Sequence, residues 1–105
     1  MMRKCRITVL KTTFDRELAD EYGVEGFGPC QIMHPGQEFV TACDKPAGLC
    51  DEAWKGMQHF VFALAHGGGE DGFFNNDWIR EPDVAICSCN DGLRPVIFKV
   101  EALQA

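Results

Sequence analysis

The chain has 105 residues, 46% of them hydrophobic and 25% charged, which is the balance of a single globular domain with one core. Its 10 Lys and Arg residues stand against 16 Asp and Glu residues, a formal net charge of −6. Because nucleic acids and anionic membrane surfaces bind positively charged proteins, we expect neither as a partner.

The first residues are basic, but no apolar segment follows them, so we expect no signal peptide. No stretch approaches the ~20 apolar residues of a membrane span, and we expect a cytoplasmic protein. In a reducing compartment, the cysteines are expected to be free thiols, metal ligands or redox groups rather than disulfides. They are Cys5, Cys30, Cys43, Cys50, Cys87 and Cys89.

The first two predicted elements are a strand and a short helix. The strand covers 4–12, and alternation places three of its side chains on one face. These are Cys5, Ile7 and Val9. The helix begins at Asp15, with Thr13 or Asp15 as its cap, and ends at Gly23. Its partial apolar stripe consists of Leu18, Ala19 and Tyr22.

A loop, a second strand and the main helix follow. Glycines and prolines mark 23–36 as the loop. The strand is predicted over 38–43, with Phe39, Thr41 and Cys43 on one side. The helix is predicted over 50–66, because apolar residues recur there at alternating intervals of four and three, and Gly67 to Gly69 end it. These apolar residues are Cys50, Trp54, Met57, Val61 and Leu64.

Residues 67–83 form a long loop that carries three aromatic side chains, those of Phe73, Phe74 and Trp78. Three placements stay open for these side chains: on the core of the domain, over a cavity, or at a subunit contact. The glycines of this loop do not indicate a phosphate-binding loop, because they follow a helix and are accompanied by acidic residues.

Two final strands are predicted over 84–89 and 94–103, joined by a hairpin turn. A two-residue turn at Asp91-Gly92 would place Cys89 opposite Arg94 and Cys87 opposite Val96. The predicted fold is a single α+β domain over 1–105, in the order β-α-β-α-β-β. It has a mixed or antiparallel sheet packed against the main helix at about 50–66.

Five segments carry a resemblance to a known family: KCRITVLK at 4–11, GPC at 28–30, GQEF at 36–39, CDEAW at 50–54 and CNDGLRPVIFK at 89–99. The chain resembles an uncharacterised family of cysteine-containing proteins of about this length from anaerobic bacteria and archaea. No activity is established for that family. The resemblance implies that four of the cysteines match positions where the family also has cysteine, while Cys43 is peculiar to this chain. The four are Cys5, Cys30, Cys50 and Cys89.

The spacing of the thiols suggests a metal site. Cys87 and Cys89 form a C-x-C pair on one face of a predicted strand, and Cys5 and Cys30 are candidates to complete a set of four ligands. Four thiolates would suit zinc or iron, the latter as an iron–sulfur cluster. However, the C-x₂-C spacing typical of such sites is absent, and cysteine also packs readily as a small buried apolar residue. Both interpretations stay open.

Two cysteines are also weak candidates for a catalytic or redox role. Cys50 lies at a helix N-terminus, where the helix dipole favours a thiolate, although the carboxylates nearby oppose it. Cys89 would face the guanidinium of Arg94 across the hairpin, unless Asp91 binds Arg94 instead in a salt bridge that closes the turn.

The histidines indicate less. His59 and His66 are two helical turns apart, too far to bind one metal ion together. His34 follows Cys30 by four residues, but Pro35 leaves the geometry of that pair open.

Three functions therefore stay open, and the first is preferred: a small thiol-rich module that binds a metal ion or small ligand. The others are a structural protein that forms a homo-oligomer through 73–78 or a strand edge, and a small cysteine-based redox protein or enzyme.

Overall fold

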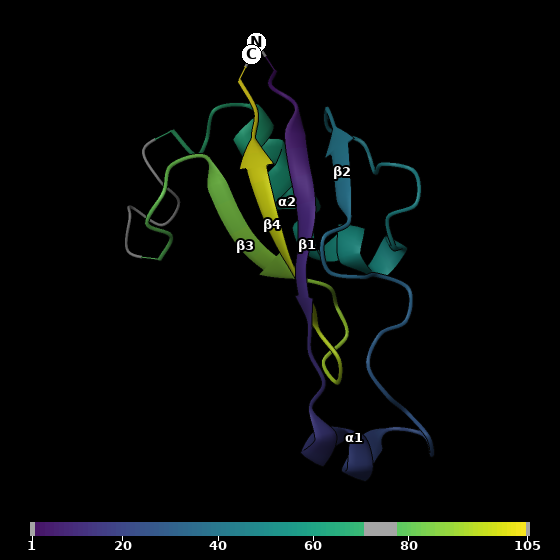
Figure 1. Cartoon of the computed structure of the whole chain (residues 1–105). Helices are drawn as coiled ribbons and strands as arrows, with labels where there is room; N and C mark the ends of the chain where they lie inside the picture. Colours follow the sequence, from purple (N-terminus) through teal and green to yellow (C-terminus); the bar gives the residue numbers. More distant parts are fainter. Residues whose placement is uncertain (1, 71–77, 105) are drawn as a thin grey trace.

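The computed structural model describes residues 2–70 and 78–104. Within these residues, four strands and two helices follow the predicted order, and the strands form one antiparallel sheet of order β2-β1-β4-β3 (Figure 1). The elements are β1 (Cys5–Thr12), α1 (Arg16–Tyr22), β2 (Glu38–Thr41), α2 (Asp51–Ala65), β3 (Val84–Ser88) and β4 (Val96–Ala102). The α+β prediction is confirmed. None of the described helices has the length and apolar character needed to cross a membrane.

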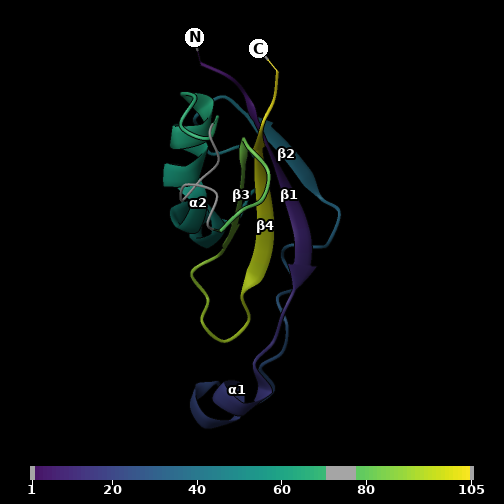
Figure 2. The ribbon, with the colours of Figure 1, turned by 90° about the vertical axis from the view of Figure 1, so that its left-hand side faces the viewer.

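Helix α2 covers one face of the sheet, and the core lies between them (Figure 2). The predicted inward face of β1 is confirmed, because Cys5, Ile7 and Val9 are all buried. The predicted stripe of α2 is confirmed in its C-terminal part, where three residues are fully buried against the sheet. These are Met57, Val61 and Leu64. The strand and helix periodicities therefore point into one core.

The end of α2 shows why the glycines follow it. Gly67 has a φ of 85°, the left-handed conformation that ends helices and that glycine adopts without steric cost. The N–H of Gly68 then donates to the carbonyl oxygen of Ala63 (2.7 Å), which satisfies a carbonyl left free by the last turn. The predicted helix end is thus confirmed.

Strand β2 is shorter than the predicted 38–43, because it ends at Thr41. The hydroxyl of Thr41 donates to the carbonyl oxygen of Asp44, and this bond turns the chain away from the sheet. Cys43 therefore lies beyond the strand, although its side chain still packs against the core.

Helix α1 lies beyond the end of the sheet, away from the core (Figures 1 and 2). Its cap is Asp15 rather than Thr13, because the Asp15 carboxylate accepts the N–H of Leu18 at 2.9 Å. Only Ala19 of its predicted apolar stripe is buried, whereas Tyr22 remains 71% exposed. The apolar stripe of α1 is therefore not buried in a core.

The predicted register of the last hairpin is wrong by two residues. Cys87 lies opposite Phe98, and the N–H of Cys89 donates to the carbonyl oxygen of Val96 (3.1 Å), so the connection covers residues 90–95. The carboxylate of Asp91 lengthens the turn by accepting two backbone N–H groups of its own loop. A shift of two residues preserves the side-chain face, and Val96, Phe98 and Val100 of β4 are all buried.

Candidate ligand pocket

A pocket of about 300 Å³ opens where three distant segments meet: the 27–33 segment, the start of α2, and the connection from β3 to β4. Each segment contributes one cysteine, and the three are Cys30, Cys50 and Cys89. Apolar side chains of Ile32, Met33, Ala53 and Val96 also line it. Its polar lining consists of Glu52, Asn90, Asp91 and Arg94. We refer to it as the thiol pocket.

Cys50 reaches the pocket because it is the N-cap of α2. Its backbone is extended (φ −61°, ψ 136°), and its side chain makes no capping hydrogen bond. The ammonium group of Lys45 fixes the chain on both sides of this residue, through the carbonyl oxygen of Leu49 (2.8 Å) and the carboxylate of Asp51 (2.9 Å). The Cys50 thiol is thus held at a helix N-terminus without being used to cap it.

Cys89 is placed by the pairing of the two last strands. Its backbone N–H donates to the carbonyl oxygen of Val96, and its Sγ accepts the N–H of Val96 in return (N···S 3.4 Å). The sulfur thus takes the place that a carbonyl oxygen would have in a regular antiparallel pair. These two hydrogen bonds hold the thiol at the end of the β3–β4 pairing, where the connection between the strands begins.

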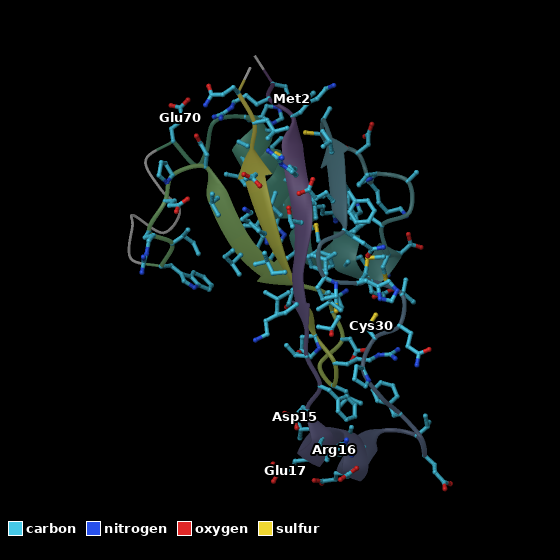
Figure 3. All side chains as sticks on the ribbon, in the orientation of Figure 1. Met2, Asp15, Arg16, Glu17, Cys30 and Glu70 are labelled. Atoms are coloured by element: carbon cyan, nitrogen blue, oxygen red, sulfur yellow. The ribbon has the colours of Figure 1, made fainter. Side chains whose placement is uncertain are left out.

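Cys30 belongs to the segment that returns from α1 toward the sheet (Figure 3). Its Sγ accepts the backbone N–H of Ile32 (N···S 3.4 Å). Met33, which is 3% exposed, anchors the segment to the core on the other side of this turn. A local hydrogen bond and one buried side chain therefore set the position of the third thiol.

Arg94 connects the pocket to the 27–33 segment. Its Nε donates to the carboxylate of Asp91 (2.8 Å), and its guanidinium carbon lies 4.4 Å from the centre of the Phe27 ring. Although burial raises the pKa of Asp91, hydrogen bonds from the Arg94 side chain and from the N–H groups of Leu93 and Arg94 outweigh it, so this pKa is lowered. Asp91 thus forms the turn-closing salt bridge that the sequence left as an alternative to a Cys89–Arg94 pair.

The thiols outside the pocket are in a different environment. Cys5 is fully buried, and burial, with a smaller contribution from Cys43, raises the pKa of its thiol to about 11. Burial raises the pKa of Cys87 to about 12. Both thiols are therefore protonated at neutral pH, as expected of cysteines that pack as apolar residues.

The predicted metal set of Cys5, Cys30, Cys87 and Cys89 is not brought together. Of these four, only Cys30 and Cys89 line the thiol pocket, where Cys50 joins them instead. In the described part of the chain, no three His, Cys, Asp or Glu side chains are already arranged around a common metal position. Three cysteines do line one pocket, but they are Cys30, Cys50 and Cys89 rather than the predicted four.

All three histidines lie outside the lining of the pocket. All three histidines are exposed, and His59 of α2 lines the open hollow beside β3, whereas His66 is the C-cap of α2. His34 does not line the pocket that Cys30 lines.

Two contributors to the site carried no clear sequence signal. Asn90 donates to the carboxylate of Glu52 (3.2 Å), which links the β3–β4 connection to the first turn of α2. Hydrogen bonds from Lys55 and Asn90 lower the pKa of Glu52, so this carboxylate is charged at neutral pH. The sequence places Asn90 only next to a predicted turn and Glu52 only in the first turn of a predicted helix.

A second, more open hollow lies beside β3, an edge strand of the sheet. Trp78, which is 65% exposed, lines it together with Phe60 and Cys87. Phe73 and Phe74 lie outside the described residues. Of the three loop aromatics, only Trp78 can thus be placed, at the side of the molecule that carries β3.

Fold and site together define a small α+β domain with a pocket lined by three cysteines. Comparison of the chain with protein-family models, with curated proteins and with solved structures finds no match. The family resemblance therefore stays a prediction, and the function is inferred from the site alone.

Proposed function

We propose that the protein is a small binding module whose ligand occupies the thiol pocket. The observation that carries this proposal is that three cysteines from three distant segments line a single pocket of about 300 Å³. Clefts of this size are typical of small-molecule or ion sites, in which a few polar groups fix the orientation of the ligand. Of the cysteines outside the pocket, Cys5 and Cys87 differ, because burial holds them protonated.

The composition of the pocket favours binding over catalysis. A thiol enzyme needs a general base within hydrogen-bond reach of its nucleophile, and histidine is the usual choice. No histidine lines the thiol pocket, although His59 lines the hollow beside β3 that Cys89 also borders, and Arg94 is held by Asp91 and Phe27. The sulfurs of Cys30 and Cys89 each accept a backbone N–H, which gives them fixed positions suited to contact with a ligand.

Native mass spectrometry of protein purified without oxygen tests this proposal. We expect the native mass to exceed the denatured mass by that of one ligand. The excess should disappear in Cys89→Ser and persist in Cys43→Ser, a matched control because Cys43 is also partly exposed but lies outside the pocket. A wild-type protein whose native and denatured masses agree would contradict the proposal.

A further inference from the structure

Strand β3 forms one edge of the sheet, and part of its backbone is directed away from β4 (Figure 1). The residues that flank β3, Asp83 and Cys89, each share a backbone hydrogen bond with β4 (2.9 and 3.1 Å). Such bonds alternate along an antiparallel strand, and the register is unbroken, so the N–H and C=O groups of Val84, Ile86 and Ser88 point to the open edge. Within the described part of the chain, no backbone group pairs with Val84 or Ile86 on that side.

This edge lacks the features that usually protect an edge strand from further pairing. The sequence of β3 is VAICS, without charge or proline, and the other edge strand, β2, is four residues long and begins with Glu38. Helix α2 covers β3 only at its end, where Gly56 lies against the carbonyl oxygen of Ser88. Ile86, at the centre of the strand, is 38% exposed. The middle of the β3 edge is therefore open to another strand.

Two hollows flank the edge, one on each face of the sheet. The hollow beside β3, of about 550 Å³, is lined from the α2 side by His59 and Phe60. A second, of about 340 Å³, lies on the face that α2 leaves uncovered, and its lining includes Arg80 and Lys99; we refer to it as the outer hollow. Ile86 lines both hollows. An extended segment paired with β3 would direct alternate side chains into the two hollows.

The hollows differ in chemistry. Phe60 and Trp78 give the hollow beside β3 an aromatic lining suited to a large apolar side chain. In the described lining of the outer hollow, Arg80 and Lys99 outnumber Glu81, in a protein of net charge −6. Lys99 also pairs with Glu101 (3.3 Å), which leaves the exposed Arg80 as the main partner for an anionic side chain.

From these observations we infer that the open edge of β3 binds an extended peptide segment of a partner protein as an additional strand. Main-chain hydrogen bonds to Val84 and Ile86 supply affinity, and the hollows select apolar side chains on one face and acidic side chains on the other. A second copy of β3 fits less well. It would direct only Ala85 and Cys87 toward the hollow of about 550 Å³, and it has no acidic residue for the outer hollow. This site acts beyond the thiol pocket and does not depend on its ligand.

Selection of peptides from a phage-displayed random library tests this inference, with the affinities of synthetic versions measured by fluorescence anisotropy. We expect the selected peptides to alternate apolar and acidic residues. Ile86→Pro removes an outward N–H without removing a bond to β4, a change that edge strands tolerate, and should weaken binding at least about 10-fold. Ile86→Val keeps this N–H and should bind nearly as the wild type does. Arg80→Glu should weaken the binding of the acidic peptides.

Methylation of the peptide backbone gives the same test from the ligand, and it holds even where a protein variant fails to fold. N-methylation at one alternating set of peptide positions should abolish binding, and at the other set should leave it nearly unchanged, because only one set faces β3. Failure to select any peptide, or equal affinity for wild type and a folded Ile86→Pro, would overturn the inference. A dimer of the wild type that Ile86→Pro dissociates in analytical ultracentrifugation would also overturn it, because the edge would then be occupied by a second copy.

Discussion

Replacing Gly56 with alanine is expected to lower the free energy of unfolding by about 2 kcal/mol, although alanine is the better helix former. A Cβ atom at this position would lie 2.3 Å from the carbonyl oxygen of Ser88. That oxygen belongs to the backbone at the end of β3 and cannot swing aside as a flexible side chain would. Helix α2 can approach β3 this closely only because residue 56 has no side chain.

Urea denaturation of Gly56→Ala measures this effect, with Gly92→Ala as the matched control. A Cβ at Gly92 meets nothing within 4 Å, so its substitution should change stability by less than about 0.5 kcal/mol. A Gly56→Ala variant as stable as the wild type would show that α2 and β3 are further apart than described. The thiol pocket depends on this contact, because Cys50 is the N-cap of α2 and Cys89 directly follows β3.

The second large effect concerns the buried thiol of Cys5. Its pKa is about 11 in the folded protein, against an ordinary value of 9.0, because burial disfavours the thiolate. The folded state therefore retains this proton at pH values where the unfolded chain loses it. The resulting stability is fully present below pH 9 and is lost as the pH rises through about 11, at up to about 1.4 kcal/mol per pH unit.

Denaturation curves of wild type and Cys5→Ala, measured between pH 8 and 11, test this expectation. The wild type should lose stability with rising pH more steeply than the variant, because the variant lacks the Cys5 thiol and keeps only the contribution of Cys87. Ile7→Val is the control, since it removes part of a neighbouring buried side chain that does not titrate and should shift the curve without changing its slope. Parallel curves for wild type and Cys5→Ala would contradict the assigned burial of the thiol.

Local periodicity was sufficient to predict the elements of this fold. The alternation of Ile7 and Val9 and the helical spacing of Met57, Val61 and Leu64 each reflect one buried face, and the structure buries all five side chains. Such patterns depend only on near neighbours in the chain, and they are therefore visible without tertiary information.

The hairpin register and the membership of the site depend on contacts that no local pattern encodes. The register followed from the Asp91 carboxylate, which accepts two N–H groups of its loop, and from the Cys89 sulfur, which accepts a strand N–H. Cys30 reaches the pocket because its segment is held by Met33 in the core and by the contact of Phe27 with Arg94. The sequence allowed Cys30, Cys50 and Cys89 to be proposed individually, but only the tertiary structure shows that they line the same pocket.

A glycine inside the predicted main helix could have indicated that another backbone segment packs closely against it. Gly56 lies in the middle of a well-formed apolar pattern, where glycine costs up to about 1 kcal/mol relative to alanine. A residue that weakens its own helix often marks a close approach of another backbone. Here that backbone is the end of β3, next to the thiol pocket.

The central claim is that Cys30, Cys50 and Cys89 can come together in one pocket, and phenylarsine oxide tests it most directly. This reagent condenses with two thiols to form a dithioarsenite and one molecule of water, and it bridges only sulfurs that can approach each other closely. Mass spectrometry of proteolytic fragments from the native protein should find one arsenical per chain, bridging two of these three cysteines. A bridge to Cys5 or Cys87, or no bridge at all, would contradict the claim.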